Sequence, residues 1–161
     1  MLAVLLLALL TSAAALSFSQ PIRAARAQDA IEQLRGFDAT ARQAAVSSGH
    51  TVRLAFDLRA GTLARRDEGG RTLRYRSTLP PGFRVDQVRV GDHTASSGQA
   101  LLDISPLGAS RTYALHLRGP STDQWLLTAG MSGQMTIVSN ETALDAIFAQ
   151  VAPPSPRHDA D

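Results

Sequence analysis

The sequence predicts an α+β fold in which one long N-terminal helix packs on a small antiparallel β-sheet. Residues 1–22 are apolar, and no charged side chain precedes Arg23. Up to residue 49 the apolar residues then recur every three or four positions, as in an amphipathic helix. From Thr51 they alternate with polar residues, as in half-buried strands. A helix grouped on one side of an antiparallel sheet is the α+β arrangement.

Residues 1–22 are long and apolar enough in sequence to cross a bilayer as a helix, since about 20 apolar helical residues span its hydrocarbon core. We expect a single-pass membrane helix, or one buried among like helices. Pro21 is expected to bend this helix without ending it. The apolar side chains expected to face lipid or like helices are those of Leu2, Val4, Leu5, Leu6, Leu7, Leu9, Leu10, Leu16 and Phe18.

A cleaved signal peptide is the alternative reading of the same segment. A signal peptide begins with basic residues and has a shorter apolar core, whereas only the terminal amine precedes Leu2 here. Small-x-small sequences at residues 13–15 and 25–27 still leave cleavage open. This alternative predicts a free secreted domain.

Residues 23–49 predict an amphipathic continuation of the same helix, which would form a stalk under a globular head. Ile31, Leu34 and Phe37 lie on its apolar stripe and are expected to fix the stalk to the head. Arg42 falls among the polar residues off that stripe, and Gly49 is expected to stop the helix.

Residues 50–138 predict the antiparallel β head, with about seven short strands separated by turn residues. The alternation slips at residues 86–87, which predicts a bulge. Residues 91–99 are polar and are expected to be an exposed loop that meets partner proteins.

Residues 139–151 predict a short C-terminal helix. Asn140 is its expected N-cap, and Ala143, Ile147 and Val151 are expected on its inner face. Residues 152–161 are expected to be a disordered tail.

Composition argues against several classes of function. There is no Cys, which excludes disulfides and thiolate metal sites. The net charge is only +2 and the Arg residues are spread out, so nucleic-acid binding is not expected. The four His residues lack metal-ligand spacing, and no nucleophile or phosphate-loop motif occurs. We therefore expect no enzyme, catalytic residue, metal or cofactor. A secreted hydrolase would need His93 or His116 to approach a carboxylate in the fold.

The order of a hydrophobic helix, an amphipathic helix and a β head resembles the plan of type IV pilins. "MLAVLLLALL" resembles the part of a pilin helix just after the prepilin cleavage motif, and Pro21 resembles the family's kink proline. Three later segments are similar to the minor pseudopilin H group of type II secretion, which includes FimT-like pilins. They are "ARQAAVSSGHTVRLAFDLRAG", "ISPLGASRTYALHLRG" with turn residues Pro106 and Gly108, and "WLLTAGMSGQMTIV" with Gly133.

This resemblance implies a structural subunit of a pseudopilus, which supports protein export across the bacterial outer membrane. The chain would cross the inner membrane once, with its head in the periplasm. Its partners would be other pseudopilins or pilins, inner-membrane lipid and secreted protein cargo. The family's basic leader and its Gly before Phe-Thr-Leu-x-Glu are not found in this sequence. We therefore expect either a longer natural N-terminus or a copy that is not processed.

Two related alternatives stay open. One is a membrane-anchored periplasmic β domain that binds a partner and takes no part in a filament. The other is a minor, FimT-like type IV pilin with no secretion role. A DNA-binding version of the latter would need Arg residues clustered on one loop or tail.

Overall fold

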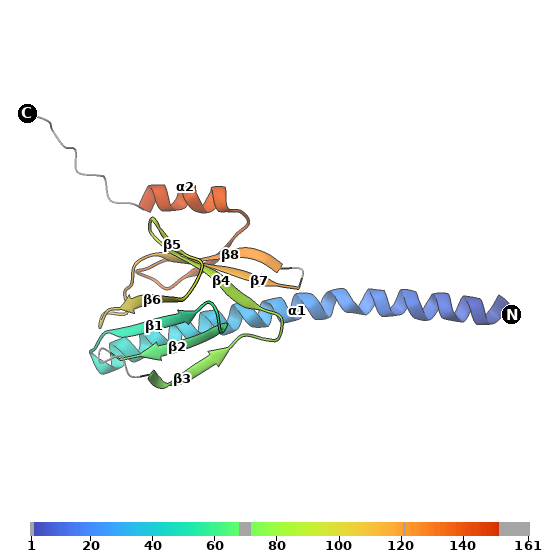
Figure 1. The fold of residues 1–161 in the computed structure, drawn as a ribbon, viewed down its shortest axis with the longest axis horizontal. Helices are drawn as coiled ribbons and strands as arrows, with labels where there is room; N and C mark the ends of the chain where they lie inside the picture. The colour runs from blue at the N-terminus through green and yellow to red at the C-terminus, as the bar shows by residue number, and fades with distance from the viewer. Residues whose placement is uncertain (1, 68–71, 121, 152–161) are drawn as a thin grey trace, which may run out of the picture.

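The computed structural model describes the backbone of residues 2–67, 72–120 and 122–151, and the side chains of residues 23–67, 76–120 and 122–150. Within these residues a long helix is followed by nine strands and a short helix (Figure 1). The helices are α1 (Leu2–Ser48) and α2 (Glu141–Val151). The strands are β1 (Val52–Asp57), β2 (Thr62–Arg66), β3 (Thr72–Thr78), β4 (Arg84–Val90), β5 (His93–Ala95), β6 (Gln99–Ile104), β7 (Tyr113–Gly119), β8 (Thr122–Thr128) and β9 (Met135–Val138).

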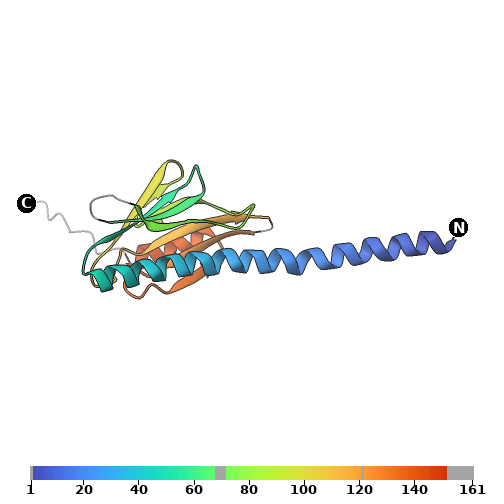
Figure 2. The same cartoon turned by 90° about the horizontal axis from the view of Figure 1, so that it is seen from below.

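α1 is one unbroken helix, as the sequence predicts, and it passes through position 21 without a gap. It ends where expected, because Gly49 adopts φ 68° and its N–H bonds the carbonyl of Ala45 at 3.0 Å. Figures 1 and 2 show the N-terminal part of α1 projecting well past the strands, with its C-terminal part lying under them. The molecule is therefore a head on a projecting helical stalk.

The head is larger than the small single sheet that we expected. It consists of a four-stranded antiparallel sheet, β3-β2-β1-β6, and a five-stranded one, β5-β4-β7-β8-β9. Sequence reasoning missed β2 and β5. Leu63 is the only fully buried side chain of β2, and β5 has three residues with no buried side chain. Residues 91–99 therefore contain an edge strand and are not simply a loop. The predicted bulge is confirmed, because the β4–β7 register shifts between Val85 and Gln87.

The main core lies between α1 and the two sheets. Ile31, Leu34 and Phe37 are only 3%, 1% and 1% exposed within it. The ring of Phe37 meets that of Phe56 on β1 edge to face, with centroids 6.1 Å apart. Because apolar burial drives folding, these side chains bind the C-terminal half of α1 to the head.

A second, smaller core joins α2 to the opposite face of the five-stranded sheet. Asn140 caps α2 as predicted, accepting a 2.8 Å hydrogen bond from the Ala143 N–H. The predicted inner face was partly wrong: Ala143 is exposed, and Leu144 and Phe148 are buried beside Trp125. The two larger apolar side chains lie four residues apart and cover more of the sheet than Ala143 could. The predicted Ile147 does pack against this core, and the side chain of Val151 lies outside the described residues.

No helix among the described residues is long and apolar enough to cross a membrane. The predicted membrane-facing side chains from Leu2 to Phe18, and the side chain of Pro21, lie outside the described residues, as does the tail at 152–161. The membrane prediction therefore still rests on the sequence.

We predict that Phe37→Ala lowers the free energy of unfolding by about 3–5 kcal/mol, because it leaves a cavity between stalk and head. Val46→Ala is the matched control on the same helix, since Val46 is 52% exposed, and it should change stability by less than about 0.5 kcal/mol. Urea unfolding followed by the fluorescence of Trp125, the only Trp, measures both. Equal effects would show that the stripe does not join the stalk to the head.

Candidate functional site

A buried ion pair on α1 forms the centre of the joint between stalk and head. Asp38 and Arg42 are one helical turn apart, and Arg42 Nε donates to Asp38 Oδ2 at 2.6 Å. Their side chains are only 4% and 11% exposed. A buried charge must be paired and fully hydrogen-bonded, so the remaining donors of Arg42 need partners in the head.

Arg42 finds those partners in two turns of the head. Its Nη1 donates to the carbonyls of Gly108 and Gly130, each at 2.7 Å, and its Nη2 donates to Ser110 Oγ at 3.0 Å. One guanidinium on the helix therefore holds the β6–β7 and β8–β9 connections side by side. We call this group of contacts the Arg42 clamp.

The three turn residues singled out in the sequence all lie in the connections that the Arg42 clamp holds. Pro106 and Gly108 belong to a turn closed by the Gly108 N–H on Ser105 O at 2.8 Å, with φ 76° at Gly108. Gly133 has φ 70°, and a Cβ there would lie 2.7 Å from Arg42 Nε. Gly133 is therefore required both by its backbone conformation and by the space that Arg42 occupies.

Tyr113 closes the other side of the ion pair. Its hydroxyl donates to Asp38 Oδ1 at 2.8 Å, so both oxygens of this buried carboxylate are hydrogen-bonded. Burial raises the pKa of Tyr113 well above its usual value near 10, and the Asp38 carboxylate raises it further. The neutral phenol is thus part of the folded state. Periodicity did not identify Asp38, Arg42 or Tyr113 as a unit, because their partners come from distant parts of the chain.

The condition for the hydrolase alternative, that His93 or His116 approaches a carboxylate, is met at His116. His116 is 8% exposed, and its Nδ1 and Nε2 lie 2.6 and 2.7 Å from oxygens of Asp86 and Asp123. Its ring stacks on Trp125 with centroids 4.7 Å apart, and Arg118 also reaches Asp86. Both ring nitrogens of His116 therefore lie within hydrogen-bonding distance of a carboxylate oxygen. The hydrolase alternative stays a prediction.

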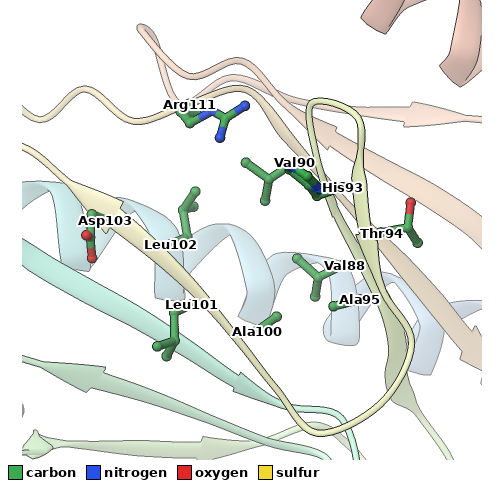
Figure 3. A pocket seen from close by; sticks show the side chains of 10 residues that line it. All are labelled: Val88, Val90, His93, Thr94, Ala95, Ala100, Leu101, Leu102, Asp103 and Arg111. Atoms are coloured by element: carbon green, nitrogen blue, oxygen red, sulfur yellow. The ribbon is translucent and has the colours of Figure 1, made fainter.

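An apolar crevice separates the edges of the two sheets. β5 and β6 are consecutive in the chain, yet among the described residues β5 pairs with β4 alone and β6 with β1 alone. The two strands therefore diverge from the turn at residues 96–98. The crevice between them has a volume of about 420 Å³, which is within the range of ligand sites. Figure 3 shows its lining by Val88, Val90, His93, Thr94, Ala95, Ala100, Leu101, Leu102, Asp103 and Arg111.

The polar groups of the crevice are few. Asp103 is neutralised by Arg53, whose two hydrogen bonds at 2.5 and 2.8 Å lower the pKa of Asp103. His93 is exposed on β5. The guanidinium of Arg111 lies against Gly91, where a Cβ would be 2.8 Å from its Nη2. Within the described part of the chain Arg111 donates no side-chain hydrogen bond and forms no ion pair. It is an uncompensated positive charge at the crevice.

Among the described residues no group of three or more acidic or His side chains is arranged to hold a metal ion. The expectation of no cofactor and no catalytic residue stays a prediction.

The fold is similar to that of a minor pseudopilin. Two solved structures of the minor pseudopilin EpsH, from the type II secretion system of Vibrio cholerae, align with this chain at TM-scores of 0.54 and 0.53. Each match covers 71% of this chain, and 96% and 98% of the respective EpsH chains, at 11% sequence identity. No protein-family model matches the sequence, and no curated protein matches it. The pilin-like fold thus rests on the structural alignment.

We predict that Gly133→Ala destabilises the protein more than Gly61→Ala does. Both glycines have positive φ, which costs a Cβ about 1–2 kcal/mol. Only at Gly133 does the methyl group also displace Arg42, whereas nothing lies within 4 Å at Gly61. The difference should be about 1–3 kcal/mol in urea unfolding, which is the cost of hydrogen bonds lost by a buried charge. Equal losses would show that the Arg42 clamp contributes nothing to stability.

We predict that Tyr113 makes the protein less stable at alkaline pH. Its pKa is raised in the folded state, so its contribution is complete below the unfolded value near 10 and is lost as pH rises above it. The free energy of unfolding should therefore fall above about pH 10 with a slope of up to about 1.4 kcal/mol per pH unit. In Tyr113→Phe this slope should be smaller. An unchanged slope would mean that the phenol is not held neutral by the fold.

Proposed function

We propose that this protein is a minor pseudopilin-like structural subunit of a type II secretion pseudopilus, and that it supports protein export across the outer membrane. The observation that carries the proposal is the pilin-like fold, with a helix fixed to the head along one half and projecting along the other (Figure 2). A filament subunit needs both parts: a helix free to pack among like helices, and a head held rigidly on it.

The Arg42 clamp offers a surface for contact with neighbouring subunits. Leu107 and Met131 are 89% and 84% exposed, and each is next to a carbonyl that Arg42 binds. Exposed apolar side chains on fixed turns are typical of protein contacts. We propose that other pseudopilins meet the head here, and that secreted cargo is a further partner.

The proposal places the head in the periplasm and residues 1–22 in the inner membrane. Its support is the apolar sequence from Leu2 to Phe18, which precedes any charged residue. Burial of that segment among like helices during assembly would replace its contact with lipid. Extraction from the membrane would then require work from an assembly motor.

The membrane-anchored binding module is the second candidate function. The crevice between β5 and β6 favours it, because an apolar site with a free positive charge is suited to a ligand whether or not the chain enters a filament.

We predict that Leu5→Arg abolishes export of type II substrates by the source bacterium. An Arg at the centre of a membrane helix costs about 3 kcal/mol, so insertion should fail. Leu5→Phe is the control and should export normally. The measurement is the amount of secreted protein in the culture medium, with an immunoblot of membrane fractions to follow the chain.

Full export with Leu5→Arg would contradict the pseudopilin-like role. If both the variant and a gene deletion leave export intact while the wild-type chain stays in the membrane, the binding-module candidate is favoured instead.

A further inference from the structure

The outer edge of β6 is open toward the crevice. β6 pairs with β1 along residues 99–104, and within the described residues no other strand borders it. Alternate residues of an edge strand direct their N–H and C=O groups away from the sheet, where they can pair with another strand. Every second residue of the six-residue β6 therefore directs its backbone N–H and C=O groups away from β1, along one wall of an apolar cleft.

The other free edges of the sheets are less suited to accept a strand. β3 carries the exposed Arg76, and charged residues are a common protection of sheet edges. β9 is next to α2, whose Leu144 and Phe148 share the second core with Val138 of this strand. β5, on the far side of the crevice, has only three residues. β6 is thus the long edge without such protection.

The side chains of β6 support the same conclusion. The strand alternates between buried Ala100, Leu102 and Ile104 and exposed Gln99, Leu101 and Asp103. Leu101 is apolar and 48% exposed on the outer face of this edge strand. It lines the crevice together with Val88 and Val90 of β4 (Figure 3). An added strand would cover this apolar surface.

The charge at the crevice indicates the chemistry of the occupant. Arg111 is the cation left without a partner among the described residues that line it, while Asp103 is neutralised by Arg53. Arg111 lies against Gly91, at the end of β5 opposite the turn that joins β5 to β6. A carboxylate on the occupant would pair with Arg111 at this open end.

We propose that the crevice binds an extended peptide segment of a partner protein, added as a strand to the free edge of β6, with apolar side chains toward Leu101 and an acidic side chain on Arg111. Strand addition to a sheet edge obtains affinity from main-chain hydrogen bonds and specificity from side-chain contacts. In an antiparallel addition the first residues of the peptide lie beside Arg111, because β6 runs toward that end. The proposal goes beyond the pseudopilin-like role, since it holds equally for a subunit and for a binding module.

The test uses the full chain in detergent micelles and the peptide acetyl-Glu-Val-Thr-Val-Thr-Val-Thr-amide. Controls are the same peptide with Gln in place of Glu, and one N-methylated at alternate residues, which cannot donate to the β6 edge. Arg111→Gln removes the cation of the crevice. Arg76→Gln is the matched control, because it removes an exposed Arg from β3 at the opposite edge of the sheet.

We expect the Glu peptide to bind at least about tenfold more weakly to Arg111→Gln than to the wild type, as for loss of a charged hydrogen bond. The Gln peptide should not distinguish the two, and Arg76→Gln should bind as the wild type does. Leu101→Ser should weaken both peptides. Hydrogen exchange should show new protection of β6 amides when the Glu peptide binds, and the N-methylated peptide should give none.

Several results would overturn the proposal: no binding of the Glu peptide up to about 1 mM, equal binding to Arg111→Gln, or no new protection in β6. A dimer of the wild-type chain that Leu101→Ser dissociates would also overturn it, because the occupant would then be a second copy. These readouts are independent of export. The peptide can therefore bind even if the Leu5→Arg test contradicts the pseudopilin-like role. Equally, the peptide can fail to bind while the Leu5→Arg test supports that role.

Discussion

The structure depends on one buried guanidinium. Arg42 is bound to Asp38 on its own helix and to three oxygen atoms in two separate turns of the head. A buried charge held by four hydrogen bonds tolerates very little displacement, because moving any partner leaves a desolvated group unpaired. The apolar stripe at Ile31, Leu34 and Phe37 supplies most of the burial between stalk and head. Burial is not directional, so the Arg42 clamp fixes the rotation and register of α1 against the head.

The divergence of β5 and β6 is the second constraint, and it creates the crevice. Consecutive antiparallel strands usually pair with each other, but here each joins a different sheet. The carbonyl of Gly98 accepts a 3.0 Å hydrogen bond from the Leu58 N–H, which ties the turn between them to the end of β1. The two sheets share one core on their inner side, where α1 lies, and remain unpaired at these edges. The open edge thus follows from the way the two sheets are connected.

Local patterns predicted what depends on local sequence. Three- and four-residue spacing predicted α1 and its buried stripe, Gly49 its end, Asn140 the cap of α2, and the slipped alternation the bulge in β4. Sequence analysis missed the division into two sheets and the strands β2 and β5. It also missed the burial of Leu144 and Phe148 on α2. β2 and β5 bury too little to produce a pattern, and they form because neighbouring strands supply their pairing. Arg42 lies among the polar residues off the packing stripe, so periodicity does not indicate its role. That role comes from hydrogen bonds of its long side chain to carbonyls 66 and 88 residues away.

The Arg42 clamp and the crevice are neighbours in the chain. Ser110 accepts from Arg42 and donates its N–H to the carbonyl of Gly130, and the next residue is Arg111, the free cation of the crevice. The position of Arg111 against Gly91 is therefore set by contacts that begin on the stalk. α1 also contacts β6 directly through the main core, so the stalk is connected to the crevice both through that core and through Ser110. The contact that holds the head on its stalk thus lies one residue from the free cation of the crevice.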